Sequence, residues 1–489
     1  MDSSSLSKTT TSALYGPLAD AEFRTLVLFP GVLGDPIRVR LRLDSLDSDP
    51  EYDALSYVWG DPHHTIDILC NDLPTPITTN LHAALVRVRS PLEPRILWAD
   101  ALCINQQDKA ERGHQVSLMG RIYSSARLVL AYMGSSPGHA GGRAISSLLL
   151  DCTPNMGESR PDTKDPRWKS LGPLFDNSWF TRAWVVQEVG LAKNPRILYD
   201  EADVSYRQLM SLVTWLYSET AEFAQENHVL VPSIHVLCPD WRDAWYHFDT
   251  PLVEQVALVD LLEWGIRLAC QDPRDHIYAF LGHPLAKSNN GAIIPDYEKE
   301  VFQVYKEVTE YLLAETGIRA LSSGRHTTAS LSDPAIPSWV LRWGPQSISS
   351  ANMKGALPFF CACGDRVEAQ IHQDNDALLI RGLEVDMVKD VYRIEADDSA
   401  RLLTFAHWSD TQALSLEEII NSTISNRYSD SDSQAQDLAW TLCAGLASGE
   451  TGGPAFPLAW IAYRSWARSP STYDKMPRLA DLFWGRCQH

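Results

Sequence analysis

The sequence predicts an α/β fold in the N-terminal half, with a parallel sheet flanked by helices, followed by a mainly helical C-terminal region. Short apolar strands alternate with amphipathic helical patterns across residues 52–192. This order is typical of parallel strands joined by crossover helices. Helical periodicity dominates from about residue 205 onward. We expect a disordered N-terminus over 1–20, an α/β domain over 21–200 and a helix-rich regulatory region over 201–489.

The first predicted elements are strands with turn residues between them. Residues 37–43 alternate between apolar and polar side chains, as in a strand with one solvent face. Residues 52–59 form a short apolar strand that ends at the Gly-Asp-Pro of 60–62. Residues 66–70 alternate again before an Asn-Asp turn. We expect Asn80 to cap the helix that follows.

The next elements complete the predicted sheet. Residues 95–100 read as a buried strand that ends in a carboxylate, and Leu128 to Tyr132 form another strand. Between them, Asp108 and Glu111 have the spacing of a helix capping box. A further helix begins near Ser178 and carries Trp184 and Glu188 one turn apart.

Three apolar segments, 54–58, 95–99 and 127–132, are predicted to be adjacent central strands of one sheet. Trp98 and Trp184 are predicted to be core residues. Parallel sheets place functional residues in the loops beyond the carboxyl ends of their strands, and here those loops begin at Trp59, Asp100 and Met133. Downstream, the sequence predicts helices near 205–217, 255–269, 298–315 and 434–447, and short strands near 367–371 and 377–381.

Composition excludes several classes of function. The formal net charge is −20, which argues against nonspecific binding to nucleic acids or anionic membranes. The Ser/Thr-rich start lacks the apolar stretch of a signal peptide, and no window reaches the length of a membrane span. The nine cysteines are scattered, which fits a thiol-reducing compartment. We therefore expect a cytoplasmic protein.

Three sequence blocks resemble the fungal heterokaryon incompatibility (HET) family in order, spacing and content. They are Tyr52-Asp-Ala-Leu-Ser-Tyr-Val-Trp-Gly60, Leu97-Trp-Ala-Asp-Ala-Leu-Cys-Ile-Asn-Gln106 and Ser178-Trp-Phe-Thr-Arg-Ala-Trp-Val-Val-Gln-Glu-Val189. Shorter echoes follow at 272–279, 295–297, 337–340 and 381–382. One departure is Ser135, which stands where the family usually has an acidic residue. The resemblance implies a role in fungal non-self recognition, growth arrest or cell death, with an incompatibility protein as partner and possible homo-oligomers.

The same blocks are distantly similar to Toll/interleukin-1 receptor (TIR) domains. Residues 52–61 resemble the first TIR strand and its loop, and Trp184 to Glu188 resemble the TIR helix in which a Trp precedes a Glu by four residues. In NAD-cleaving TIR domains this glutamate is catalytic. The resemblance thus implies a catalytic role for Glu188, with NAD as substrate rather than cofactor, and Glu188→Gln is expected to keep the fold and abolish cleavage.

The chemistry of such a site needs few residues. Cleavage of the nicotinamide–ribose bond develops positive charge on the ribose, which a carboxylate stabilises. Glu188 and Asp100 are the candidate catalytic residues. Tyr57 and Trp59 are candidates to stack on a nicotinamide or adenine ring. Asn105 and Gln106 are candidates to hydrogen-bond ribose hydroxyls or a carboxamide.

Simpler roles remain open for the same residues. Glu188 could be a solvated or salt-bridged group, Asp100 could shape its turn, and Glu111 could be a helix cap. Cys103 with His114 makes a weak candidate for a nucleophilic pair, because nothing local orients it. A lone Cys361-x-Cys363 lacks the partner ligands of a zinc site, so no metal is predicted. The rival functions are a non-enzymatic assembly module and a small-molecule biosynthetic enzyme on the HET scaffold.

Overall fold

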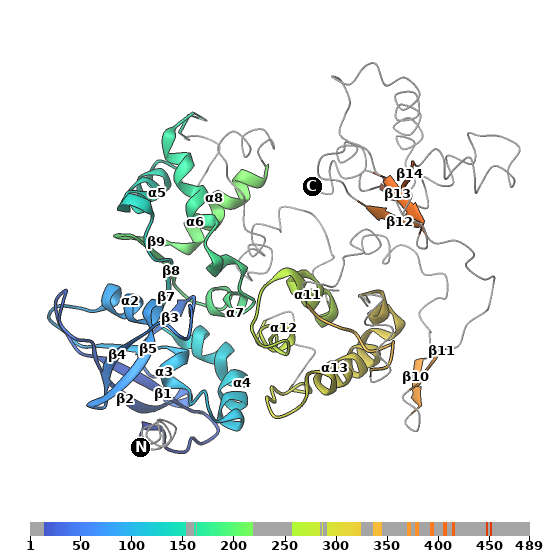
Figure 1. Cartoon of the computed structure of the whole chain (residues 1–489), viewed down its shortest axis with the longest axis horizontal. Helices are drawn as coiled ribbons and strands as arrows, with labels where there is room; N and C mark the ends of the chain where they lie inside the picture. Colours follow the sequence, from blue (N-terminus) through green and yellow to red (C-terminus); the bar gives the residue numbers. More distant parts are fainter. Residues whose placement is uncertain are drawn as a thin grey trace, which may run out of the picture. The chain divides into compact units, whose positions relative to one another are not determined.

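A computed structural model describes residues 14–152, 161–162, 164–218, 257–283, 286, 291–323 and 336–344, together with short strands between 369 and 451. The chain divides into two compact units, Met1–Ile348 and Ser349–His489. In the second unit the described elements are three small antiparallel sheets. Two of them are labelled in Figure 1, namely β10 (Ala369–His372) with β11 (Ala377–Ile380), and β12 (Tyr392–Glu395) with β13 (Thr404–His407) and β14 (Ala413–Ser415). The third pairs β15 (Leu446–Ala447) with β16 (Glu450–Thr451).

The first unit is built around one nine-stranded sheet with the order β5-β4-β2-β1-β6-β3-β7-β8-β9. Its strands are β1 (Glu22–Leu28), β2 (Arg38–Ser45), β3 (Asp53–Tyr57), β4 (Thr65–Cys70), β5 (Leu73–Thr78), β6 (Arg95–Trp98), β7 (Leu128–Tyr132), β8 (Pro195–Tyr199) and β9 (Ala202–Ser205). Neighbouring strands β6, β3, β7 and β8 are parallel. The prediction of three adjacent central strands is confirmed.

The prediction of a wholly parallel sheet is wrong, because the sheet is mixed. Strand β1 runs antiparallel to both β2 and β6, and the hairpins β4–β5 and β8–β9 add antiparallel pairs. The turn between β4 and β5 carries Asn71 and Asp72 with φ of 49° and 62°. Asn and Asp tolerate this left-handed conformation, and the predicted Asn-Asp turn is confirmed.

Helices cover the sheet around its parallel centre (Figure 1). Helix α2 (Thr79–Val88) packs on β3, β4 and β5, and α7 (Val185–Gly190) packs on β3 and β7. Helix α4 (Lys109–Ser125) packs against α7 and begins at the predicted N-cap, Asp108. The predicted cap of α2 is wrong, since Thr78 accepts the cap bond from the Leu81 amide. Every residue of β3 is buried, so both faces of the sheet are covered there.

The other described helices lie between the strands, or after the last strand of the sheet, in chain order. They are α3 (Asp100–Cys103), α5 (Gly141–Asp151), α6 (Leu171–Phe175), α8 (Tyr206–Ser218), α11 (Leu258–Trp264), α12 (Asp275–Tyr278) and α13 (Val301–Thr316). The helices predicted near 205–217 and 298–315 correspond to α8 and α13, and that near 255–269 to α11 with a 3-10 turn. The helical character of the region beyond 344 stays a prediction, because most of it lies outside the described residues.

Residues at the start of the chain also contact the sheet unit. Residues 1–13 of the predicted disordered segment lie outside the described residues. The Tyr15 hydroxyl donates to the Leu102 carbonyl at 3.1 Å, and the Arg24 guanidinium stacks over the Tyr15 ring. Within the described part of the chain, no helix is both long and apolar enough to cross a membrane.

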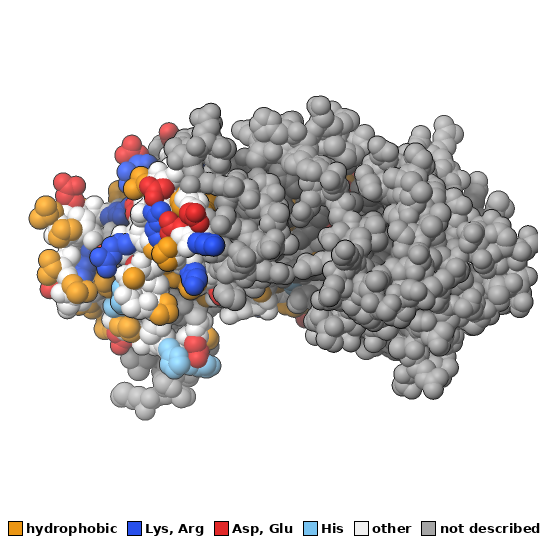
Figure 2. Space-filling view, turned by 90° about the horizontal axis from the view of Figure 1, so that it is seen from above, with side chains coloured by type: hydrophobic (Ala, Val, Ile, Leu, Met, Phe, Trp, Pro, Cys, Tyr) orange, Lys and Arg blue, Asp and Glu red, His pale blue; other side chains and the backbone are white. Residues whose placement is uncertain are grey.

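Charged side chains of both signs lie interspersed on the described part of the face shown in Figure 2.

The core of the first unit contains Trp98, whose side chain is fully buried. Its ring packs edge-on against Tyr123 from α4, with centroids 5.3 Å apart. Trp98 therefore joins the central strand β6 to a covering helix, as predicted for a core residue.

Trp98→Ala is expected to lower the free energy of unfolding by about 3–5 kcal/mol, the usual cost of truncating a large buried aromatic. Denaturant-induced unfolding of the full chain, followed by tryptophan fluorescence, measures the change. Leu92→Ala is the control, because the Leu92 side chain is 84% exposed and its loss should change stability by less than about 0.5 kcal/mol. Equal stability of the two variants would show that Trp98 does not hold α4 to the sheet.

Candidate functional site

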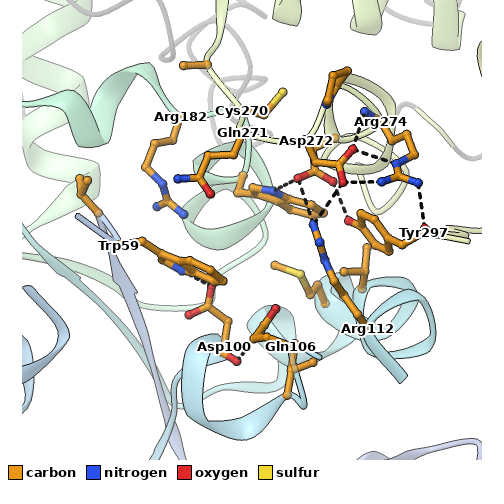
Figure 3. A pocket seen from close by; sticks show the side chains of 18 of the residues that line it. Trp59, Asp100, Gln106, Arg112, Arg182, Cys270, Gln271, Asp272, Arg274 and Tyr297 are labelled. Atoms are coloured by element: carbon orange, nitrogen blue, oxygen red, sulfur yellow. Dashed lines mark hydrogen bonds and ion pairs between the residues drawn. The ribbon is translucent and has the colours of Figure 1, made fainter. Parts of the chain in front are cut away.

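A cavity of about 750 Å³ lies beyond the carboxyl ends of β3 and β6 (Figure 3). One wall comes from the strand-end loops and α4, and the other from residues 269–275, 297 and 301. Polar and aromatic side chains predominate among the lining residues, which include Trp59, Asp100, Gln106, Arg112, Arg182, Trp184, Gln271, Asp272, Arg274, Asp275 and Tyr297. This is the edge at which the sequence predicted functional loops.

The strand-end loops place an indole and a carboxylate together at the cavity. The Trp59 Nε1 donates to Asp100 Oδ2 at 2.7 Å, and the Tyr57 hydroxyl donates to Asp100 Oδ1 at 3.0 Å. Gly60 follows with φ of 78°, a conformation that Gly adopts without strain. Of the two residues predicted to stack on a ligand ring, Trp59 lines the cavity and Tyr57 does not. The Tyr57 side chain is buried, and this burial raises the pKa of the Tyr57 hydroxyl well above its usual value.

The two predicted amide residues differ in position. Gln106 lines the cavity and its Nε2 donates to the Asp100 carbonyl at 2.9 Å. Asn105 does not line it; its side-chain oxygen accepts from the Gln107 amide at 3.2 Å. The Asn105 amide donates to Glu111, whose carboxylate also pairs with Arg24 at 2.6 Å. Glu111 therefore ties the loop to β1 rather than completing a capping box.

Glu188, the predicted catalytic carboxylate, does not line the cavity. Its side chain is buried and accepts a hydrogen bond from Ser56 Oγ in β3. The Arg182 guanidinium forms a two-point pair with both carboxylate oxygens, at 3.1 and 3.2 Å. Burial raises the pKa of the Glu188 carboxyl, and Arg182 and Ser56 offset part of that rise. Arg182 lines the cavity, so it stands between Glu188 and the cavity space.

The position of Arg182 depends on a segment far downstream. Arg182 and Ala269 form a parallel β-bridge. The Ala183 amide donates to the Ala269 carbonyl at 2.9 Å, and the Ala269 amide donates to the Thr181 carbonyl at 2.6 Å. Backbone pairing therefore holds the chain on both sides of Arg182 against the second wall.

The second wall is a cluster of acidic and aromatic side chains that were not among the predicted site residues. Asp275 accepts from the Tyr297 hydroxyl at 2.6 Å and from Trp184 Nε1 at 3.2 Å. Trp184 is thus half-buried and lines the cavity, and its prediction as a core residue is wrong. Burial raises the pKa of Asp275 to about 6. The only sequence feature that pointed to these residues was the resemblance of segments 272–279 and 295–297 to the HET family.

The other sequence candidates do not form a site. Cys103 is fully buried, and burial raises the pKa of its thiol. His114 bonds the Asp20 carbonyl at 3.0 Å instead of a thiol. Among the described residues, no group of three or more His, Cys, Asp or Glu could hold a metal ion. Cys361 and Cys363 lie outside the described residues.

Comparisons with known proteins agree with the sequence blocks. Residues 52–188 match the family model described as "Heterokaryon incompatibility protein (HET)". The chain is 24% identical over 444 residues to "Heterokaryon incompatibility protein 6, OR allele" from Neurospora crassa, an alignment that covers 73% of this chain and 63% of that relative. No solved structure matches the chain. The family match includes Trp59, Asp100 and Arg182, whereas the second wall lies beyond it.

Glu188→Gln is expected to destabilise the fold by about 3–5 kcal/mol, because the swap leaves the Arg182 cation without its counter-charge in a buried site. This differs from the expectation that the fold would stay intact, which assumed an accessible carboxylate. Denaturant-induced unfolding tests it. Combining Glu188→Gln with Arg182→Met should recover part of the loss, since no unpaired charge then remains; additive losses would mean that the two side chains are not coupled.

Asp275 is expected to make stability fall as pH rises. A carboxyl whose folded pKa is about 6 and whose ordinary value is 3.8 binds its proton more tightly in the folded state, so its contribution is lost as pH rises through 6. Between pH 5 and 7.5 the wild type should lose about 1 kcal/mol relative to Asp275→Asn. Unfolding curves of both proteins at the two pH values measure this, with Glu93→Gln, at an exposed position, as control. Parallel pH profiles would contradict the assignment.

Proposed function

The chain belongs to the heterokaryon incompatibility (HET) family, and on that premise we propose that it is an effector of fungal non-self recognition that cleaves NAD at its nicotinamide–ribose bond. The chain spans 63% of the length of the curated relative it matches, so the activity and partners of the whole protein are part of this proposal. The expected partner is an incompatibility protein, and the proposed small-molecule substrate is NAD.

The observation that carries the catalytic proposal is the cavity at the carboxyl ends of β3 and β6. This is the edge at which α/β sheets bind ligands. There Trp59 offers an indole face, Gln106 an amide, and Asp100 a carboxylate. A cationic nicotinamide ring is attracted to both an indole face and a carboxylate. The same residues belong to the segment that matches the HET family.

Cleavage at this site needs one carboxylate and one water. The C–N bond breaks, its electron pair leaves with neutral nicotinamide, and water adds to the ribosyl cation, giving ADP-ribose and a proton. Asp100 can stabilise the cation from its present position. Glu188 can do so only after Arg182 turns away, because that guanidinium now occupies the space between Glu188 and the cavity.

A second candidate function is signalling by assembly without turnover. The burial of Glu188 favours it, because a carboxylate that is paired with Arg182 and closed off from the cavity serves the fold. Under this alternative, the domain would act by associating with copies of itself or with a partner, and the cavity residues would be needed only for folding or ligand-dependent exposure of a surface.

The test is incubation of the purified full chain with NAD at high protein concentration, with free nicotinamide measured by chromatography. Wild-type protein is expected to release nicotinamide. Asp100→Asn and Glu188→Asp are expected to slow release, with a loss of about 10²–10³ for the carboxylate that acts in the transition state. Glu188→Asp keeps a negative charge opposite Arg182, so a loss of nicotinamide release in this variant cannot be attributed to an unpaired Arg182.

Arg121→Gln is the matched control for these variants, because Arg121 lies on α4 and pairs with Asp47 on the exposed surface, outside the cavity. Growth inhibition on overexpression is scored for the same set of proteins. Wild-type protein that leaves NAD intact and still arrests growth would replace the catalytic proposal with the assembly one.

A further inference from the structure

The two carboxylates of the second wall already accept hydrogen bonds from neighbouring groups. Both oxygens of Asp272 accept from Arg274, each at 2.8 Å. Both oxygens of Asp275 also have donors, the Tyr297 hydroxyl and Trp184 Nε1. The remaining Arg274 nitrogen donates to the Tyr297 and Lys299 carbonyls. Each of the four carboxylate oxygens therefore has at least one donor that does not come from Arg112.

Arg112 is the guanidinium that this arrangement leaves without a close acceptor. Its nearest carboxylate oxygens belong to Asp272 and Asp275, at 3.7 and 3.8 Å, beyond hydrogen-bond distance. Its guanidinium carbon lies 3.7 Å from the centroid of the Tyr297 ring, which fixes the plane of the five N–H donors. The side chain is 30% exposed and lines the cavity (Figure 3).

Two indoles line the same cavity with their N–H groups already bound. Trp59 donates to Asp100 and Trp184 donates to Asp275. Each bond fixes the edge of its ring, while both side chains stay partly exposed. An indole held by its N–H has its π face left for contact, and such faces stack on planar aromatic ligands.

We propose that this cavity binds a nucleotide, with a phosphate group accepting hydrogen bonds from Arg112 and the aromatic base packed against the indole faces of Trp59 and Trp184. A phosphate offers the paired oxygens that a planar guanidinium binds in a two-point manner. The inference rests on the cavity of the proposed function and extends it, because it assigns recognition of the phosphate to Arg112, whose guanidinium is held over the Tyr297 ring of the second wall.

The charges around Arg112 give the binding a pH dependence. Asp272 and Asp275 on the second wall face it, with Tyr297 beneath it and Arg274 beyond Asp272. Burial raises the pKa of Asp275 to about 6, so this residue loses its negative charge as pH falls from 7.5 to 5.5. Repulsion between Asp275 and a phosphate then weakens. A phosphate monoester also gains a proton over this range, because its second pKa is about 6, so its attraction to Arg112 weakens as well and the two effects oppose each other.

The experiment compares AMP with adenosine, which differ by one phosphate and carry no nicotinamide bond to cleave. Binding to the full chain is measured by isothermal titration calorimetry. Wild-type protein is expected to bind AMP about 10- to 100-fold more tightly than adenosine, the range for hydrogen bonds to a charged group. Arg112→Gln should abolish this difference while adenosine affinity stays unchanged. Arg121→Gln, on the same helix but outside the cavity, should behave as the wild type.

A second measurement avoids any effect of the variant on folding. In wild-type protein, raising the salt concentration should weaken AMP binding and leave adenosine binding unchanged. Equal affinities for AMP and adenosine in wild-type protein, or an AMP affinity that survives Arg112→Gln, would overturn the proposal. Because binding is read directly, tight AMP binding with NAD left intact would support this inference while contradicting cleavage.

Discussion

The structure of the first unit depends on one constraint, a glutamate carboxylate buried under the sheet. An ionised Glu188 without a partner would carry a desolvation cost of several kcal/mol, and Arg182 and Ser56 offset it. Ser56 in turn accepts from Trp179 Nε1 at 2.7 Å. The pair requires the chain at 181–184 to follow one path, and that path lies against Ala269. A single buried charge therefore links the central strand β3 to Ala269, which lies 212 residues beyond the end of that strand (269 − 57).

The cavity follows from this link, because its two walls come from the two segments that the constraint joins. Close packing also holds the two wall segments together. The Gln187 side chain donates to the Tyr278 carbonyl at 3.1 Å, and a side chain at Gly113 would place its Cβ 2.7 Å from the Pro295 carbonyl oxygen. Residues outside the family-model match therefore complete a site whose first wall lies inside it.

Much of the central fold could be predicted from local patterns, since the central strands β3 and β7 are short, mainly apolar segments between helical ones. The strand-end position of Asp100 followed from the same topology. The antiparallel strands β2 and β4 were predicted from their alternation, whereas β1 and β5 were missed, because β5 carries two prolines and β1 mixes polar with apolar residues. The burial of Glu188 could not be predicted: a glutamate on a short helix looks solvated until its partner Arg182 is placed. Asp275 and Tyr297 joined the site through tertiary contacts that no local spacing encodes.

A site that is shared between two segments couples ligand binding to their docking. Arg112 on the first wall is held over the Tyr297 ring of the second wall. A ligand that contacts both Trp59 and Arg112 therefore binds the docked arrangement better than an open one. At a ligand concentration 100 times the Kd, such preferential binding stabilises the docked state by about 2.7 kcal/mol. That is comparable with the strength of one or two hydrogen bonds to a charged group, at about 1.5–3 kcal/mol each. Loss of the ligand, by release or by cleavage, would remove this contribution and leave the Arg182–Glu188 pair and the Ala269 bridge to hold the walls together. The same geometry therefore provides a way for the state of a small molecule to reach the rest of the chain.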